Sequence, residues 1–227
     1  MKAYIFDLDG TLLDSMDVWK NIDTDFLAKR GLAVPAGYAD KISSMSFPEA
    51  AVYTIKRFGL SDGIDGLLRE WNDMAAYAYE NTVQMKPYAK EYLWELRERG
   101  MKLGVATSSM PALYEPALRN HGIYDWFDVI CSSDEAGCGK SRPDVFLFTA
   151  KRLHVQPRDC VVFEDILAAV KSAKSIGMTV YGVYDEASKA DWEQIIKTAD
   201  GVIYDFQNAP LPKINQSEFG HNNSKMY

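Results

Sequence analysis

Two aspartates, Asp7 and Asp9, follow the apolar run Ala3–Phe6 and stand just before Gly10. Carboxylates two positions apart at the end of a strand can reach one site only if the chain leaves the sheet and turns, which Gly10 permits. Carboxylates gathered in this way repel one another without a cation, and hard divalent cations prefer such oxygen ligands. The alternative is that the pair begins a solvated loop. The strand before it and the Gly-Thr after it favour a site for chemistry.

The elements that must position this pair alternate along the chain. Short apolar runs predict strands, and amphipathic segments such as 88–99 and 166–176, each followed by a glycine, predict helices. Strands that alternate with single helices are typical of a doubly wound parallel α/β sheet covered on both faces. The expected strands are Ala3–Phe6, Lys102–Ala106, Val129–Cys131, Cys160–Phe163, Thr179–Val183 and Gly201–Ile203.

The region between the first and second expected strands breaks this alternation. It shows only helical patterns, such as the apolar face formed by Leu67, Trp71, Met74 and Ala78. A helical block of this length is too long for a crossover helix, so we interpret it as an inserted cap over the carboxyl end of the sheet, where ligands bind. The predicted organisation is an α/β core of residues 1–15 and 84–209, an all-helical cap of residues 16–83 and a polar tail of residues 210–227.

The run Asp-Leu-Asp-Gly-Thr resembles the opening motif Asp-x-Asp-Gly-[Thr/Val] of the haloacid dehalogenase-like hydrolase superfamily. Further motifs of that family follow in the expected order at later strand ends. They are Thr107, Ser108 and Ser109 after the second strand, Lys140 in Gly-Lys-Ser-Arg-Pro-Asp after the third, and Glu164 with Asp165 after the fourth. The pattern is most similar to the β-phosphoglucomutase-like branch, and the helical insertion lies where that family carries its C1 cap. The resemblance thus implies a Rossmann-like core with a helical C1 cap.

The resemblance also implies a chemistry, the hydrolysis of a phosphate monoester. Asp7 would attack phosphorus and form an aspartyl-phosphate, and Asp9 would protonate the leaving alkoxide and later activate water. Thr107 would bind phosphoryl oxygens with help from backbone amides and nearby hydroxyls. Lys140 would keep Asp7 ionised and offset charge in the transition state. The remaining groups expected to bind phosphate or substrate are Gly10, Ser108 and Ser109.

A magnesium ion is the cofactor that the resemblance implies. Asp165, together with Glu164, would complete a Mg²⁺ shell that also includes Asp7 and the main-chain carbonyl of Asp9. The cation would bind a phosphoryl oxygen and shield the anionic nucleophile from the anionic substrate. An alternative for Asp165 is that it caps the helix expected from about residue 166.

The cap separates phosphatases from sugar-phosphate mutases within this branch. In the mutase, a cap histidine assists proton transfer and a cap arginine holds the second phosphate, but here Trp19 and Phe47 stand at these positions. The histidines His121, His154 and His221 all lie outside the expected cap. Hydrolysis is therefore the favoured reaction, with a mutase as the alternative. Trp19 and Phe47 also predict an apolar lining suited to a less polar leaving group.

Four other functions that the motifs could indicate are less favoured. A binding protein that keeps the fold without activity is disfavoured because every expected group is present. Asp9 argues against a dehalogenase, since that branch lacks an acid there. A receiver domain would carry its acids and its phospho-acceptor on separate strands and would lack the helical insertion. A phosphonatase needs a cap lysine, and none of Lys20, Lys29, Lys41 and Lys56 is singled out by its surroundings.

Composition narrows the expected partners and compartment. The net charge of −7 disfavours binding to nucleic acid, and no apolar run approaches the ~20 residues that span a bilayer. The initial apolar run is too short for a signal peptide. Cys131, Cys138 and Cys160 show no metal-binding spacing, which fits a reducing cytoplasm. We expect a cytoplasmic monomer that acts on a small phosphorylated metabolite.

Overall fold

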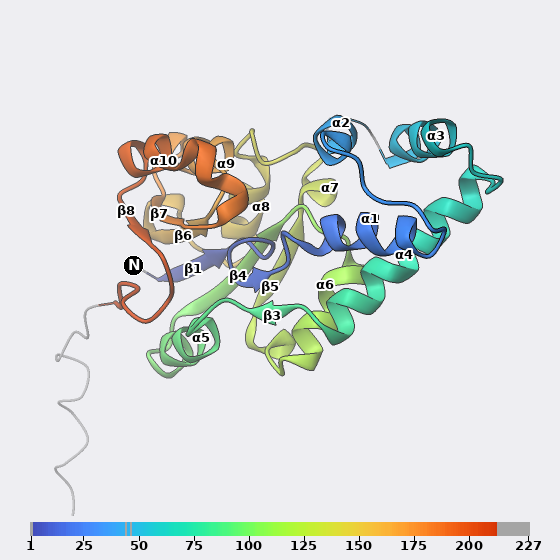
Figure 1. The fold of residues 1–227 in the computed structure, drawn as a ribbon. Helices are drawn as coiled ribbons and strands as arrows, with labels where there is room; N and C mark the ends of the chain where they lie inside the picture. Colours follow the sequence, from blue (N-terminus) through green and yellow to red (C-terminus); the bar gives the residue numbers. More distant parts are fainter. Residues whose placement is uncertain (1, 44, 46, 213–227) are drawn as a thin grey trace, which may run out of the picture.

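A six-stranded parallel sheet forms the centre of the protein in a computed structural model that describes residues 2–43, 45 and 47–212 (Figure 1). The strand order is β5-β4-β1-β6-β7-β8, so β1 lies between β4 and β6. The doubly wound α/β fold is confirmed, and β4, β5 and β6 each run one residue further than expected. The strands are β1 (Ala3–Phe6), β4 (Lys102–Thr107), β5 (Val129–Ser132), β6 (Cys160–Glu164), β7 (Thr179–Val183) and β8 (Gly201–Ile203).

Side chains of β1 alternate between two hydrophobic cores, one on each face of the sheet. Tyr4 and Phe6 face the core covered by α5 and α6, whereas Ala3 and Ile5 face the core covered by α8, α9 and α10. Because the strands are buried on both faces, their sequences are continuous apolar runs rather than alternating ones. The helices of this part are α5 (Ala89–Glu98), α6 (Pro111–Asn120), α7 (Ser133–Ala136), α8 (Asp144–Arg152), α9 (Leu167–Ser175) and α10 (Trp192–Thr198), with 3₁₀ turns η1 (Tyr124–Trp126), η2 (Pro157–Asp159) and η3 (Glu186–Asp191).

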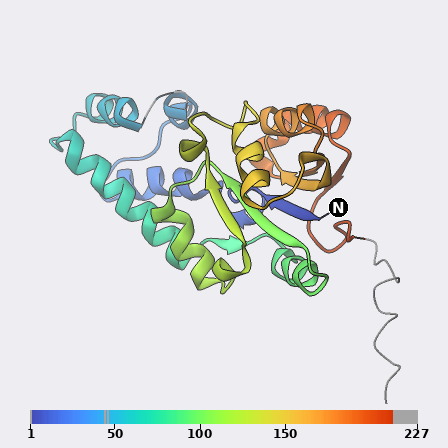
Figure 2. The same ribbon diagram turned by 180° about the vertical axis from the view of Figure 1, so that it is seen from behind.

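The inserted segment is helical, as predicted. Helix α4 is 18 residues long and runs beside α6 of the core (Figure 2). Aromatic rings hold the insertion together: Trp71 packs against Phe26 at 5.6 Å and against Phe47 at 5.5 Å between ring centroids. The exact limits of the cap, residues 16–83, stay a prediction. The helices are α1 (Val18–Ala28), α2 (Tyr38–Ser43), α3 (Phe47–Phe58) and α4 (Ile64–Asn81).

A short antiparallel ladder joins the two chain segments that link insertion and core. Strand β2 (Leu13–Asp14) pairs with β3 (Gln84–Met85), and neither was expected from the sequence. The next residue, Lys86, donates from its ammonium group to Asp14 at 3.2 Å and to Asp185 at 2.6 Å. Asp185 follows β7 closely and is buried. The ladder is therefore tied to the loop at the carboxyl end of the core sheet.

The start of the predicted polar tail contacts helix α5. The hydroxyl of Tyr92 donates to the carbonyl of Pro210 at 2.7 Å, and Arg99 donates to the carbonyl of Pro212 at 3.3 Å. Residues 213–227 of the predicted tail lie outside the described residues.

The cysteines and the lengths of the helices bear on the expected compartment. Cys131, Cys138 and Cys160 are all free thiols. Within the described part of the chain, no helix combines the length and the apolar character that crossing a bilayer requires.

Candidate active site

The loop after β1 turns sharply and gathers around Leu8. The amides of Thr11, Leu12 and Leu13 all donate to the carbonyl of Leu8, at 3.2, 2.9 and 2.8 Å. Gly10 has a φ of +83°, in the left-handed region, and a β-carbon there would lie 2.5 Å from Oδ2 of Asp165. Glycine is therefore needed for the turn and also for the close approach of Asp165 to the loop.

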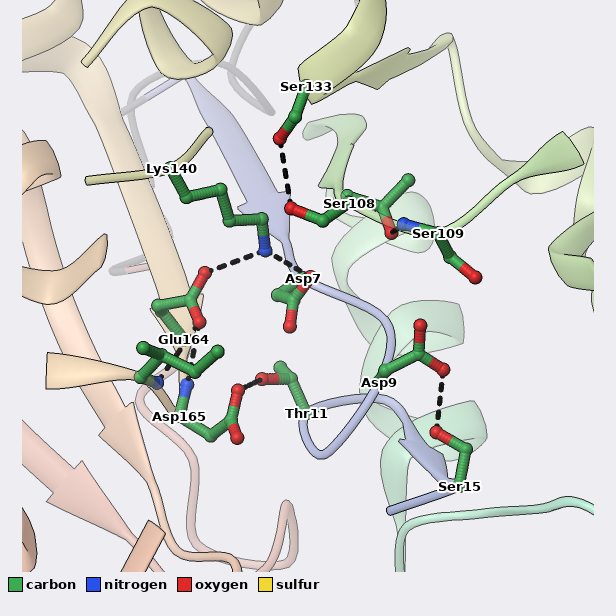
Figure 3. A network of polar contacts seen from close by, with 12 residues as sticks. Asp7, Asp9, Thr11, Ser15, Ser108, Ser109, Ser133, Lys140, Glu164 and Asp165 are labelled. Carbon is green, nitrogen blue, oxygen red and sulfur yellow. Dashed lines mark hydrogen bonds and ion pairs between the residues drawn. The ribbon is translucent and has the colours of Figure 1, made fainter. Parts of the chain in front are cut away.

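Asp7, Glu164 and Asp165 come together at the carboxyl ends of β1 and β6 (Figure 3). In the described part of the chain, they form a group whose ligand oxygens all lie within 4.8 Å of one another, and all three are buried. Lys140 forms ion pairs with Asp7 and with Glu164, the latter at 2.9 Å. The hydroxyl of Thr11 donates to Oδ1 of Asp165 at 3.3 Å. Side chains from three separate stretches of sequence thus meet in one buried polar cluster.

Burial and crowding perturb the ionisation of this cluster. Burial raises the pKa of Asp7, the charge of Glu164 raises it further, and Lys140 acts in the opposite direction. Burial also raises the pKa of Asp165, with added effects from Glu164 and Asp7. Burial alone would lower the pKa of Lys140, but the charges of Asp7 and Glu164 outweigh it and raise this pKa. Lys140 is therefore held as a cation, whereas the raised pKa values of Asp7 and Asp165 oppose their ionisation.

The donor set of this cluster fits Mg²⁺. Lys140 compensates only one of the three carboxylate charges, and hard oxygen ligands are those that Mg²⁺ prefers. Both carboxylate oxygens of Glu164 already accept hydrogen bonds, Oε2 from Lys140 at 2.9 Å and Oε1 from the amides of Asp165 and Ile166 at 3.1 Å. Among the described residues, Asp165 accepts only from the hydroxyls of Thr11 at 3.3 Å and Ser188 at 3.1 Å, and Asp7 pairs with Lys140 through Oδ1 alone. These two carboxylates are therefore the better placed to offer oxygens to a cation.

Asp9 lies in the same loop and is held by two hydroxyl groups. Ser15 and Tyr79 each donate to its Oδ1, both at 2.6 Å. Sequence analysis did not identify either donor. The signal for Ser15 was weak, a hydroxyl shortly after the turn. No local pattern marks Tyr79, which lies 70 positions from Asp9.

The expected phosphate-binding hydroxyls lie at the end of β4. Thr107 is buried, and its Oγ1 accepts a hydrogen bond from the amide of Ser109 at 2.9 Å, which stabilises the turn after the strand. The hydroxyl of Ser108 lies 3.0 Å from that of Ser133, a residue that the sequence analysis did not select. The structure therefore brings Thr107, Ser108 and Ser109 to the same edge of the sheet as Asp7 and adds Ser133 beside them (Figure 3).

The two predicted cap residues form a pair of their own. Trp19 packs edge to face on Phe47 with ring centroids 5.4 Å apart, and Phe47 also packs on Trp71. Trp19 remains 38% exposed. The structure thus brings Trp19 and Phe47 together in the cap, whereas their role in binding substrate stays a prediction.

Comparison with known proteins assigns the chain to a family. A family model described as haloacid dehalogenase-like hydrolase matches residues 1–177. The chain belongs to the haloacid dehalogenase-like hydrolases and is an enzyme of that hydrolase class.

Individual relatives have related descriptions. The chain is 30% identical over 210 residues to a bifunctional riboflavin kinase/FMN phosphatase of Arabidopsis thaliana, covering 92% of this chain but only 54% of that protein. It is 26% identical to a phosphorylated carbohydrates phosphatase of Thermotoga maritima, covering 81% of this chain and 85% of that one. A crystal structure of β-phosphoglucomutase from Clostridium difficile shares the fold, with a TM-score of 0.68 and 23% identity over 93% of this chain and 94% of the other.

Proposed function

We propose that this enzyme is a Mg²⁺-dependent phosphatase that hydrolyses a small phosphate monoester through an aspartyl-phosphate on Asp7. One observation carries the proposal: Asp7, Lys140, Glu164 and Asp165 form a buried cluster at the end of the central strands, with Asp9 two residues from Asp7. The phosphatases among its relatives support the same reaction. A small phosphorylated metabolite is the proposed substrate, and a monomer in the cytoplasm is the proposed working form.

In the first step, a carboxylate oxygen of Asp7 attacks phosphorus, and the bond from phosphorus to the ester oxygen breaks. Asp9 gives its proton to the departing oxygen, which leaves as an alcohol. Lys140 stabilises the ionised form of Asp7 and lies where negative charge develops on the phosphoryl group. Thr107 and the neighbouring hydroxyls at the end of β4 supply donors to the phosphoryl oxygens.

In the second step, the aspartyl-phosphate is hydrolysed. Asp9, now ionised, takes a proton from a water molecule while the water oxygen attacks phosphorus. The bond between phosphorus and Asp7 then breaks, which releases inorganic phosphate and restores the carboxylate. Asp9 ends the cycle protonated, as it began, so the two steps balance.

Asp7, Asp165 and the main-chain carbonyl of Asp9 would hold Mg²⁺, with Glu164 nearby to position Lys140. When bound, the cation offsets the negative charge shared by the acids and the phosphoryl group. Asp7, Glu164 and Asp165 are all buried, so the acids that surround this position are shielded from bulk solvent.

A sugar-phosphate mutase is the second candidate, because the chain shares its fold with a β-phosphoglucomutase. Two observations favour hydrolysis. His121 follows α6 and donates from Nε2 to the carbonyl of Val83 at 2.9 Å, and His154 follows α8, so neither belongs to the helices of the insertion. Trp19 and Phe47 offer an apolar pair where a mutase would need polar groups for a second phosphate.

Phosphate release from a panel of sugar phosphates, nucleotides, cofactor phosphates and 4-nitrophenyl phosphate tests the proposal. Each ester is assayed with Mg²⁺, with a chelator and with Asp7→Asn. Turnover that requires Mg²⁺ and disappears in Asp7→Asn would support the phosphatase. Release of no phosphate from any ester would refute it. Conversion of a hexose 1-phosphate to its 6-phosphate in the presence of a bisphosphate primer would instead support the mutase.

A further inference from the structure

One carboxylate oxygen of Asp9 accepts hydrogen bonds from two different parts of the molecule. Ser15, which follows β2, and Tyr79, which lies on helix α4 of the insertion, both donate to Oδ1 at 2.6 Å. Figure 3 shows the contact with Ser15, which comes from the side of Asp9 away from Asp7. The other oxygen, Oδ2, remains available for a proton that Asp9 can exchange.

Tyr79 is held firmly at this place. It is only 4% exposed, and it lies in the last turns of α4, directly before the ladder of β2 and β3. Tyr77 on the same helix is 65% exposed, so the burial belongs to the face that carries Tyr79. Burial, together with the negative charge of Asp9, raises the pKa of Tyr79, which keeps its hydroxyl protonated and able to donate.

We propose that Tyr79 is a positioning residue for Asp9, which fixes the carboxyl group so that its proton sits on Oδ2 and can reach the leaving oxygen. This inference rests on the proposed function. Donors from Ser15 and Tyr79 occupy the lone pairs of Oδ1, so a proton placed on Oδ1 would displace one of them. The proton of the acid form therefore belongs on Oδ2. Because Tyr79 lies on α4, the second of these two donors is in place only while this cap helix is seated on the core.

If Tyr79 positions Asp9, removing its hydroxyl should lower kcat/KM by an amount that depends on the leaving group. An alkoxide leaves poorly without a proton, whereas 4-nitrophenolate leaves with little help from an acid. The value of kcat/KM reports phosphoryl transfer to Asp7 and departure of the leaving group, so we compare an alkyl phosphate with 4-nitrophenyl phosphate. We expect Tyr79→Phe to lower kcat/KM about 10- to 100-fold for the alkyl ester, the effect of one hydrogen bond to a charged group, and only about twofold for the nitrophenyl ester.

Tyr77→Phe is the matched control, because it removes a hydroxyl two positions away on the same helix from an exposed side chain. We expect it to leave both values unchanged. Ser15→Ala removes the other donor to Oδ1 and should show the same dependence on leaving group as Tyr79→Phe. Thermal unfolding of each variant checks that it folds.

Equal losses on both esters, a change in KM alone or no loss in Tyr79→Phe would overturn the inference while leaving the phosphatase intact. A wild-type enzyme that releases phosphate from neither ester with Mg²⁺ present would overturn the proposed function, and the inference with it.

Discussion

Replacing Gly10 with alanine tests how closely the loop after β1 is built around Asp165. A β-carbon at Gly10 would lie 2.5 Å from Oδ2 and 3.0 Å from Cγ of Asp165, too close for both groups to stay. The carboxylate of Asp165 would have to move away from its hydroxyl donors, Thr11 at 3.3 Å and Ser188 at 3.1 Å. The substitution should therefore disturb the fold and the acid cluster together.

The expected cost has two parts. Alanine at a φ of +83° costs about 1–2 kcal/mol, because the left-handed region crowds a β-carbon. Loss of one hydrogen bond to the Asp165 carboxylate adds about 1.5–3 kcal/mol. Gly31 separates these parts, since its φ is +71° and a β-carbon there meets no atom within 4 Å. Gly31→Ala should lose only the first amount from the free energy of unfolding.

Urea unfolding of both variants measures the difference, which we expect to be at least about 1.5 kcal/mol in favour of Gly31→Ala. Titration with Mg²⁺, followed through the midpoint of thermal unfolding, should show weaker stabilisation of Gly10→Ala than of Gly31→Ala. Equal free energies of unfolding in the two variants would show that the Asp165 carboxylate can move away from residue 10 without cost, which would refute the reasoning. A weaker Mg²⁺ response in Gly31→Ala as well would remove the link between Gly10 and the metal site.

Three further predictions concern the charged groups. Lys140→Met should lower kcat/KM at least about 100-fold because it removes the cation beside Asp7, and phosphate release at near wild-type rates would contradict this. Lys86→Met should cost about 3 kcal/mol of the free energy of unfolding because it leaves Asp185 buried and unpaired, and adding Asp185→Asn should restore part of that loss in urea unfolding. Because folding raises the pKa of Asp165 to about 9, the folded state binds more protons than the unfolded state between about pH 4 and pH 9. Its stability in chelator should therefore fall as pH rises, and Asp165→Asn should flatten this slope by up to about 1.4 kcal/mol per pH unit; parallel slopes would be inconsistent with a raised pKa.

The sequence predicted the core sheet well because of where these strands lie. Strands such as Ala3–Phe6 and Cys160–Glu164 are buried on both faces, so each appears as a continuous apolar run. A polar side chain directly after such a run lies where the strand ends, and in a parallel sheet the carboxyl ends of the strands meet at one edge. The proximity of Asp7 to Asp165 followed from these two facts, and the structure places their ligand oxygens within 4.8 Å of each other.

The ladder that joins insertion and core could not be predicted in the same way. Strands β2 and β3 have two residues each, which is too short for any periodicity to show. The salt bridge of Lys86 with Asp185 joins residues 99 positions apart, and both occur in stretches that read as ordinary polar loops. The role of Glu164 was only partly visible, since the sequence indicates an acid but not that its oxygens are used by Lys140 and main-chain amides.

Tyr79 shows why contacts between cap and core escape sequence analysis. An aromatic residue on the buried face of an amphipathic helix gives the same pattern whether its hydroxyl is free or hydrogen-bonded. What decides the contact is the seating of α4 against α6 and the ladder at its end, which together bring the hydroxyl within 2.6 Å of Asp9. The core motifs alone therefore specify which acid is present, whereas the packing of the cap specifies which of its oxygens can carry the proton. A change in the cap far from phosphorus can thus alter the reaction without touching any residue of the core motifs.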